Sequence, residues 1–176
     1  MIRKILIDTE NDPCDSLRCK NKYNVPSYDN FIDDLIDTLS STDGVGLAAP
    51  QIGLPFNVFV IRNGHFKVYI NPKIVAKSIA KVSSDEGCLS IPNVTGKVMR
   101  HQWVDVEYQD EMYNIIKERL DARKTLDAII FQHEYDHLQG ILFTDRIEKK
   151  ICPVCKREHK NEKSIYCSKE CFLSRK

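Results

Sequence analysis

The segment that most constrains the fold runs from Thr125 to Leu138, where apolar residues recur at helical spacing and lead into two histidines. The residues of this stripe are Leu126, Ile129, Ile130, His133 and His137. Gly140 follows where such a helix would end, since glycine readily adopts the left-handed conformation found there. We therefore predict a helix here, and the rest of the chain has to pack around it.

The residues before this helix predict strands without a regular alternation of strands and helices. The β-rich runs are Asn57 to Ile61, Phe66 to Ile70 and Trp103 to Tyr108, and we expect antiparallel pairing. An earlier helix should be capped by Ser27 and end at Asp43-Gly44. Its apolar face would hold Phe31, Ile32, Leu35, Ile36 and Leu39, and its polar face Asp29, Asp33, Asp34 and Asp37. The predicted fold class is α+β, with antiparallel sheets packed around the central motif-bearing helix.

Composition and charge predict a soluble globular protein. Of the 176 residues, 42% are hydrophobic and 29% are charged, which favours neither disorder nor a membrane protein. The apolar run near Met1 is far too short for a signal peptide, and we expect no membrane association. We expect a monomer in the cytoplasm or an organelle matrix, where clustered cysteines usually bind metal instead of forming disulfides.

The segment His133 to His137 has the pattern H-E-x-x-H, which predicts a catalytic metal site. Residues four apart on a helix lie on the same face, so the imidazoles of His133 and His137 can reach one ion. Glu134 would lie beside that ion, close enough to a bound water to accept its proton. The alternative is a pair of partly buried histidines on an amphipathic helix.

Two histidines leave a catalytic metal site one protein ligand short. Phe143 stands where one class of metalloprotease has a third histidine, and Glu148 or a glutamate of the charged tail would have to serve in a thermolysin-like site. Cys88 is a better candidate, because it lies in a non-helical stretch beside Gly87, where the backbone can approach closely. A lone cysteine is often core filler, so the residues alone leave both interpretations of Cys88 open.

Three segments together resemble the signature motifs of peptide deformylases, in their order and at about their separations. They are Gly44 to Gln51 (GVGLAAPQ), Glu86 to Ser90 (EGCLS) and Gln132 to His137 (QHEYDH). Ile91-Pro92 and Leu142-Phe143-x-Asp145 add to the resemblance, which covers roughly residues 1 to 147. It implies a metal-dependent hydrolase that removes the formyl group from the N-terminal formylmethionine of nascent polypeptides and releases formate.

The resemblance also implies a role for each motif residue. The implied metal ligands are Cys88 as thiolate, His133 and His137, with a water as the fourth ligand. Glu134 would be general base and then general acid, while Gln51 and the backbone N–H of Leu89 would stabilise the developing oxyanion. The family favours Fe²⁺ in vivo, and Zn²⁺, Ni²⁺ or Co²⁺ would also suit these ligands.

Substrate binding can be placed on the same motifs. We expect the peptide to lie along Gly44, Val45, Gly46, Glu86 and Gly87, where side chains in place of the glycines would obstruct it. Leu126, Ile129 and Ile130 could form an apolar pocket for methionine, with Val45 opposite. These residues could equally be ordinary turn and core positions.

Two positions depart from the family. Thr95 stands where many bacterial members carry an arginine that holds the substrate backbone, so peptide selectivity could differ. The highly charged segment from Gln109 to Lys124 is expected to be a loop of uncertain geometry, without a catalytic position.

The segment 149–176 differs in kind from residues 1–148. It carries nine Lys or Arg against three Glu, a net charge of +6, which leaves −5 for the rest of the chain. A C-x2-C…C-x3-C pattern predicts a structural Zn²⁺ held by Cys152, Cys155, Cys167 and Cys171. We predict a catalytic domain over 1–148 and a zinc-finger-like module over 149–176, which is too short to fold without the ion. His159 could replace one cysteine, and free thiols are the alternative.

The predicted partners are formylated nascent peptides. The basic tail could also bind ribosomal RNA or another polyanion, or it could be merely solvated. A metalloendopeptidase is the chief alternative function, but it would need neither Cys88 nor Gln51. A nucleic-acid-binding protein with an inactive body is a second alternative, and it would have no chemical need of Glu134.

Overall fold

The computed structural model describes residues 1–8, 15–21, 23–25, 30–147, 150–159 and 166–174. A five-stranded antiparallel sheet has the order β1-β2-β3-β6-β7. Its strands are β1 (Gly46–Ala48), β2 (Val58–Asn63), β3 (His65–Lys77), β6 (Trp103–Gln109) and β7 (Ile115–Asp121). The three predicted β-rich runs thus fall on β2, β3 and β6, and their antiparallel pairing is confirmed.

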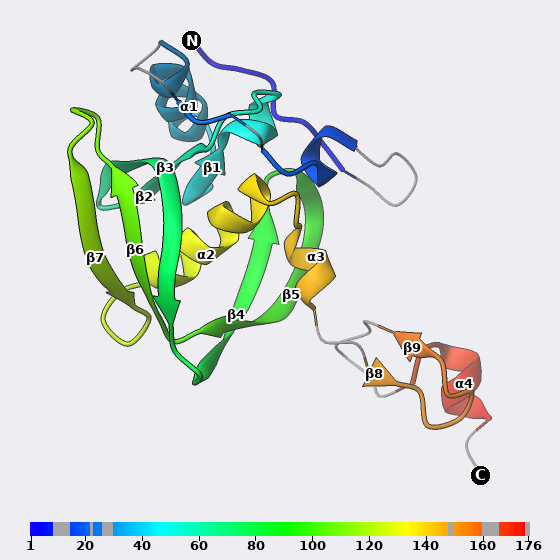
Figure 1. Ribbon diagram of the computed structural model, residues 1–176. Helices are drawn as coiled ribbons and strands as arrows, with labels where there is room; N and C mark the ends of the chain where they lie inside the picture. Colours follow the sequence, from blue (N-terminus) through cyan, green and yellow to red (C-terminus); the bar gives the residue numbers. More distant parts are fainter. Residues whose placement is uncertain (9–14, 22, 26–29, 148–149, 160–165, 175–176) are drawn as a thin grey trace.

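A second antiparallel sheet is a hairpin of β4 (Lys81–Cys88) and β5 (Ile91–His101). Helix α2 (Asp127–Leu138) runs between this hairpin and the larger sheet, as Figure 1 shows. Short helices complete the body: η1 (Asp15–Arg18), α1 (Asn30–Ser40), η2 (Ala49–Ile52) and α3 (Phe143–Arg146). The expected α+β class, with antiparallel sheets around the motif-bearing helix, is confirmed.

Helix α2 ends as its sequence predicts. Gly140 has φ 72° and donates its backbone N–H to the carbonyl of His137 at 3.1 Å. A Cβ at this position would also lie 2.5 Å from the carbonyl oxygen of Arg18, so the left-handed turn and the close packing both require glycine.

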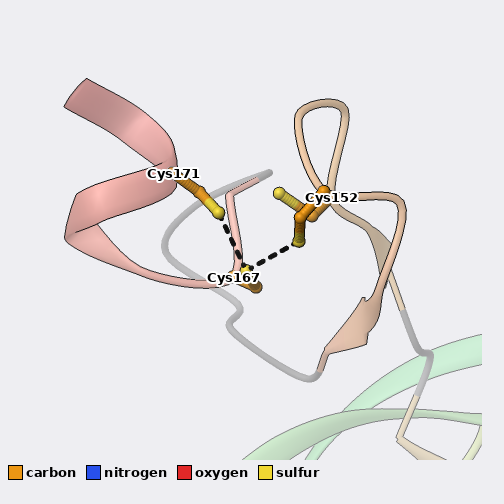
Figure 2. Close-up of side chains that lie close together, drawn as sticks. Cys152, Cys167 and Cys171 are labelled. Carbon is orange, nitrogen blue, oxygen red and sulfur yellow. Dashed lines mark hydrogen bonds between the residues drawn. The ribbon is translucent and has the colours of Figure 1, made fainter. Parts of the chain in front are cut away.

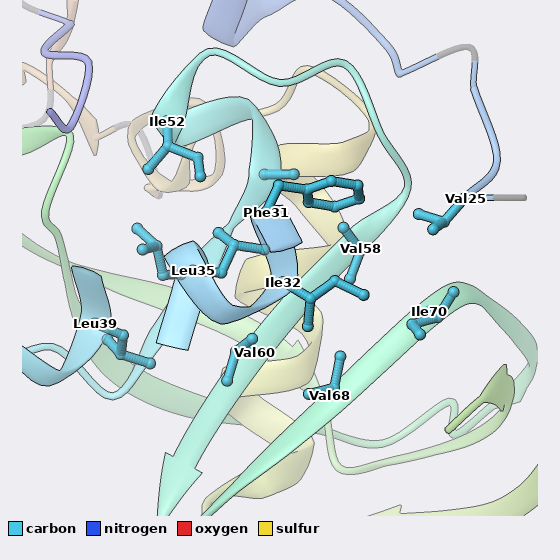
Figure 3. Packing of buried hydrophobic residues seen from close by; sticks show 12 residues of the cluster. Val25, Phe31, Ile32, Leu35, Leu39, Ile52, Val58, Val60, Val68 and Ile70 are labelled. Carbon is cyan, nitrogen blue, oxygen red and sulfur yellow. The ribbon is translucent and has the colours of Figure 1, made fainter. Parts of the chain in front are cut away.

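Helix α1 packs its apolar face on the larger sheet, where Figure 3 shows the side chains gathered into one cluster. The helix ends at Ser40 and not at Asp43-Gly44 as predicted, because three hydroxyls bond carbonyls of its last turn. They belong to Ser40, Ser41 and Thr42. The predicted cap, Ser27, lies outside the described residues.

Asp34 does not lie on the solvent face of α1 as expected. Its side chain is 8% exposed, and Arg3 forms an ion pair with it at 2.5 Å. The polar face of the helix is therefore partly covered by the N-terminal segment, which the residue pattern of the helix alone does not reveal.

The segment Gln109 to Lys124 is not the loop that its charge suggested. Strand β7 (Ile115–Asp121) lies within it and pairs with β6 in continuous antiparallel register. Lys117 pairs with Glu107 at 3.0 Å and Arg119 with Asp105 at 2.6 Å, so these charges neutralise each other across the strands.

The C-terminal segment contains β8 (Lys150–Ile151), β9 (Glu158–His159) and helix α4 (Lys169–Leu173). Strands β8 and β9 pair with each other in antiparallel register. Among the described residues, no helix is both long and apolar enough to cross a membrane.

Candidate active site

Cys88, His133 and His137 come together where the end of β4 meets helix α2. Their candidate ligand atoms all lie within 4.8 Å of one another, and Sγ of Cys88 is 3.4 Å from Nε2 of His137. The two histidines are one helical turn apart, as the spacing predicted, and their ring centroids are 5.1 Å apart. The sulfur of Cys88 therefore lies beside the histidine pair, at a distance that would let the three residues share one ion.

A buried chain of charges holds His133 in place. Nδ1 of His133 donates to Oε2 of Glu86 at 2.9 Å, and the other side of that carboxylate accepts two hydrogen bonds from Arg100, at 2.7 and 2.8 Å. Arg100 also pairs with Asp136, which accepts from Arg146 as well. Each member therefore has a charged partner, as burial of charge requires.

The pKa values within this site follow from burial and hydrogen bonding. Burial alone would raise the pKa of Glu86, but hydrogen bonds from Arg100 and His133 outweigh it and lower the pKa to about 2. Burial lowers the pKa of His137 well below its ordinary value, which keeps its ring neutral and able to bind a metal. Burial raises the pKa of Glu134 to about 7.

Glu134 is buried beside the cluster, at 3% exposure. Its Oε2 atom has no hydrogen-bond partner among the described residues, which is rare for a buried carboxylate. A Cβ at Gly46 would lie 2.3 Å from Oε1 of Glu134, so only glycine at this position leaves room for the carboxylate.

Gln51 points its amide at the same place. Its Oε1 accepts from the backbone N–H of Ala48 at 2.8 Å, and this bond fixes which way the amide faces. Its Nε2 donates to Sγ of Cys88 at 3.6 Å and to Oγ of Ser90 at 3.2 Å. Gln51 is 1% exposed, so this orientation is held by the packed interior.

A cavity of about 570 Å³ opens beside the cluster. All the residues expected to bind substrate line it, namely Gly44, Val45, Gly46, Glu86, Gly87, Leu126, Ile129 and Ile130. Gln51, Cys88, Leu89, Thr95, His133 and Glu134 line it too. The carboxylate of Glu86 is bonded to Arg100 and His133, so it orients the His133 ring in addition to lining the cavity.

The residues present fit a divalent metal. One thiolate sulfur and two imidazole nitrogens suit zinc, iron, cobalt or nickel and leave a fourth position for water or substrate. The buried Oε2 of Glu134 also fits, because a group bound at that fourth position would supply the partner that the described residues do not.

Sequence reasoning missed Arg100 and Asp136 as parts of the site. Arg100 is 3% exposed on β5, two residues after the fully buried Val98, so it occupies an inward-facing position of the strand. An arginine that continues the inward-facing alternation of Gly96 and Val98 is a signal that could have found it, since a buried charge needs partners.

A second cluster lies in the C-terminal segment, where Cys152, Cys155, Cys167 and Cys171 bring their sulfurs within 4.8 Å of one another. Figure 2 shows three of these side chains pointing toward a common centre. Cys167 lies 3.4 Å from both Cys155 and Cys171, sulfur to sulfur. The four predicted ligands are therefore brought together, and this donor set suits a structural zinc ion.

Comparison with known proteins points to one family. The family model described as Polypeptide deformylase matches residues 7–151. A peptide deformylase of Pseudothermotoga lettingae is 40% identical over 92% of this chain and 97% of its own length. Peptide deformylase 1B, chloroplastic/mitochondrial, of Arabidopsis thaliana is 39% identical over 81% of this chain and 54% of its own.

The fold comparison gives the same result. The crystal structure of peptide deformylase from Thermotoga maritima superposes with a TM-score of 0.74 at 33% identity, covering 84% of this chain and 99% of that one. The family match spans the catalytic cluster and ends before Cys152. This chain therefore belongs to the polypeptide deformylase family and is a metal-dependent enzyme that removes N-terminal formyl groups.

Proposed function

We propose that the chain hydrolyses the formyl group of N-terminal formylmethionine on nascent polypeptides, using Cys88, His133 and His137 to hold the metal and Glu134 to move the proton. The observation that carries this proposal is the buried carboxylate of Glu134, which lines the same cavity as Cys88 and His133 and whose Oε2 has no hydrogen-bond partner among the described residues. The metal would supply Lewis acidity, which activates water and polarises the formyl carbonyl.

Glu134 has the position and the pKa for general base and then general acid catalysis. Burial raises the pKa of Glu134 to about 7, so near neutral pH the same carboxyl can accept a proton from the attacking water and return it. The returned proton goes to the amine of the departing peptide, while the formyl carbon leaves as formate. Gly46 gives the carboxylate the space to do this.

Gln51 and Leu89 would stabilise the negative charge that develops on the formyl oxygen. The amide Nε2 of Gln51 is held toward the cluster by the bond between Ala48 and Oε1, so little reorganisation is needed during the reaction. The backbone N–H of Leu89 follows directly on Cys88 in the chain. A neutral amide suits this position, because it stabilises an anion without binding one permanently.

The cavity suits the side chain of formylmethionine. Val45, Leu126, Ile129 and Ile130 give it apolar walls beside His133, and the exposed Gly87 leaves the backbone of the rim open to a peptide. Thr95 also lines the cavity, where it offers a hydroxyl and no charge.

The remaining assignments extend this proposal. We propose Fe²⁺ as the metal in vivo, with Zn²⁺, Ni²⁺ or Co²⁺ as substitutes, and a structural Zn²⁺ on the four tail cysteines. Residues 1–148 would be the catalytic domain and 149–176 the zinc-binding tail of a monomer in the cytoplasm or an organelle. The Arabidopsis relative is named as a chloroplastic and mitochondrial protein.

Ribosome binding by the tail has a separate test. The net charge of +6 over 149–176 favours contact with RNA, which would weaken steeply with salt. A chain truncated after Glu148 should lose co-sedimentation with ribosomes at low salt, and unchanged co-sedimentation would rule out this role.

A metalloendopeptidase is not favoured as the function of this chain, because its mechanism would use neither Gln51 nor Cys88.

The decisive experiment measures formate released from a formyl-Met-Ala-Ser peptide by anaerobically purified protein. Glu134→Gln keeps the shape of the side chain and removes its proton transfer, so we expect a loss of about 10²-fold to 10⁴-fold with metal content unchanged. Absence of formate from the fully metallated, folded wild-type protein would refute the proposal. Cleavage at internal peptide bonds of unformylated peptides would favour the endopeptidase instead.

A further inference from the structure

A second cavity, of about 370 Å³, lies against a different face of helix α2 from the catalytic cavity. The helix contributes Gln132, Tyr135 and Asp136 to it, whereas His133 and Glu134 line the catalytic cavity. The two cavities have no lining residue in common among the described residues. The second cavity is large enough for a small organic ligand, and such a ligand would not compete with the formylated peptide.

The charges that line the second cavity are mostly positive. Lys77, Lys81, Arg100 and Arg146 line it together with a single carboxylate among the described residues, that of Asp136. This carboxylate accepts hydrogen bonds from both Arg100 and Arg146. Asp136 is therefore occupied by the two arginines and leaves the charges of the two lysines unbalanced.

The two lysines lie close to each other in the chain, on either side of a tight connection. Lys77 ends β3 and Lys81 begins β4, and both side chains are exposed. Among the described residues, the lysines that form ion pairs are Lys67, Lys97 and Lys117. The ammonium groups of Lys77 and Lys81 are thus available to an anion that enters the cavity.

The remaining walls offer a hydroxyl and an apolar surface. The phenol oxygen of Tyr135 accepts the backbone N–H of Ile74, which leaves its own proton available as a donor. Val75 and Met99 also line the cavity, and they are 59% and 37% exposed. An anion that carried an apolar group would cover these two side chains, whereas a bare inorganic ion would leave them in water.

We propose that the second cavity binds a small organic phosphate, whose phosphate group is held by Lys77 and Lys81 and whose apolar part packs on Val75 and Met99. A phosphate group carries up to two negative charges near neutral pH, so it matches two unpaired ammonium groups better than a carboxylate with one charge does. Lysine is also a common phosphate ligand in proteins, where it acts as a point charge.

The test titrates the metal-loaded full chain with adenosine monophosphate, a probe that joins a phosphate to an apolar ring, and measures the heat of binding. At low salt we expect this probe to bind at least about fivefold more tightly than adenosine, which lacks the phosphate. Inorganic phosphate should displace it. The affinity should fall at about 0.5 M salt, where exposed charges are screened.

Variants identify the residues responsible. The double variant Lys77→Gln, Lys81→Gln should weaken binding of adenosine monophosphate by about 2-fold to 30-fold, since each exposed ion pair contributes modestly. Lys73→Gln is the matched control, because Lys73 is exposed on the same strand and does not line the cavity. Lys169→Gln is the control for phosphate binding by the basic tail. Both controls should leave the affinity unchanged.

The outcomes separate this cavity from the other places where a phosphate could bind. Displacement of the probe by the product peptide Met-Ala-Ser would place it in the catalytic cavity and overturn the proposal. Equal affinity for adenosine and its monophosphate would also overturn it, as would an affinity that the double variant does not change. A dissociation constant above about 10 mM in the wild type would show that the cavity binds no such ligand.

Discussion

Nδ1 of His133 donates a hydrogen bond to Oε2 of Glu86 at 2.9 Å. This bond fixes the tautomer of the ring and leaves Nε2 of His133 free to bind a metal. The Nδ1 atom of His137, in contrast, has no hydrogen-bond partner among the described residues. The two histidines of one helical turn are therefore oriented differently, His133 by a carboxylate and His137 by packing.

Glu86→Gln should weaken metal binding by about 10-fold to 100-fold, because the amide cannot supply the negative charge that makes His133 a stronger ligand. Competition with a chelator measures this affinity directly. Asp105→Asn is a suitable control, since it breaks the exposed pair with Arg119 and should leave the metal affinity unchanged. Equal affinities for wild type and Glu86→Gln would argue that burial alone orients the ring.

Gly46→Ala should abolish most turnover while the protein still folds. The new methyl carbon would lie 2.3 Å from Oε1 of Glu134, and the carboxylate would have to swing away from the metal. We expect kcat to fall by at least about 10²-fold, the usual cost of losing a general base. A Cβ at Gly87 meets atoms at 3.6 Å or more, so Gly87→Ala is the control for stability. Full activity of Gly46→Ala would contradict the assigned role of Glu134.

Asp121 should make the fold sensitive to acid. Hydrogen bonds from the side chain and the backbone N–H of Arg123 lower the pKa of Asp121 to about 2. Because the folded-state pKa lies below the unfolded value of 3.8, the carboxylate stabilises the fold above pH 4, and this contribution disappears as pH falls toward 2.

Urea unfolding of wild type and Asp121→Asn tests this at pH 6, 4 and 2.5. The gap between the two midpoints should be present at pH 6 and shrink as pH approaches 2. The gap will be modest, since the side chain of Arg123 is 66% exposed. Glu111→Gln, at an exposed turn, should show no comparable change. If the difference between the two midpoints did not change with pH, Asp121 would stabilise the fold through its backbone geometry and not through its charge.

Cys155→Ser should remove one metal equivalent without removing activity. Protein refolded with excess Zn²⁺ would bind two ions per chain, and the variant one, because a site of four thiolates tolerates the loss of one poorly. Cys19→Ser is the control, since Cys19 is exposed and outside both clusters. Two equivalents in the Cys155 variant would indicate that His159 or water completes the site.

Local patterns in the sequence were sufficient to predict helix α2 and the three residues that it contributes to the candidate site. His133, Glu134 and His137 are fixed by helical spacing, so their geometry follows once the helix is assigned. Cys88 could not be placed by spacing, because it is 49 positions away from His137 and only the tertiary fold joins them. Its assignment as a ligand came from the family motif.

The parts that were missed depend on pairing between distant segments. Strand β7 was hidden by Lys117 and Arg119, whose charges are neutralised by partners on β6. Asp34 was expected in solvent because its partner Arg3 lies 31 positions away. The burial of Arg100 is explained only by its ion pairs with Glu86 and Asp136, which come from other segments of the chain. In each case the position of the charged side chain, buried or exposed, follows from its ion-pair partner. The periodicity of the sequence does not identify that partner.

The distance along the chain between Cys88 and His137 has a consequence for how the two clusters acquire their ions. The catalytic ligands meet only after β4 and α2 have packed together, and closing a long loop of unfolded chain is costly in entropy. The four tail cysteines all lie between positions 152 and 171, so they can gather around an ion with little of the fold in place. In a newly made chain, the tail cysteines would thus bind their ion while the tail folds around it. The Cys88, His133 and His137 cluster would bind its ion only after the cavity has formed. The supply of metal would therefore limit the two binding steps independently.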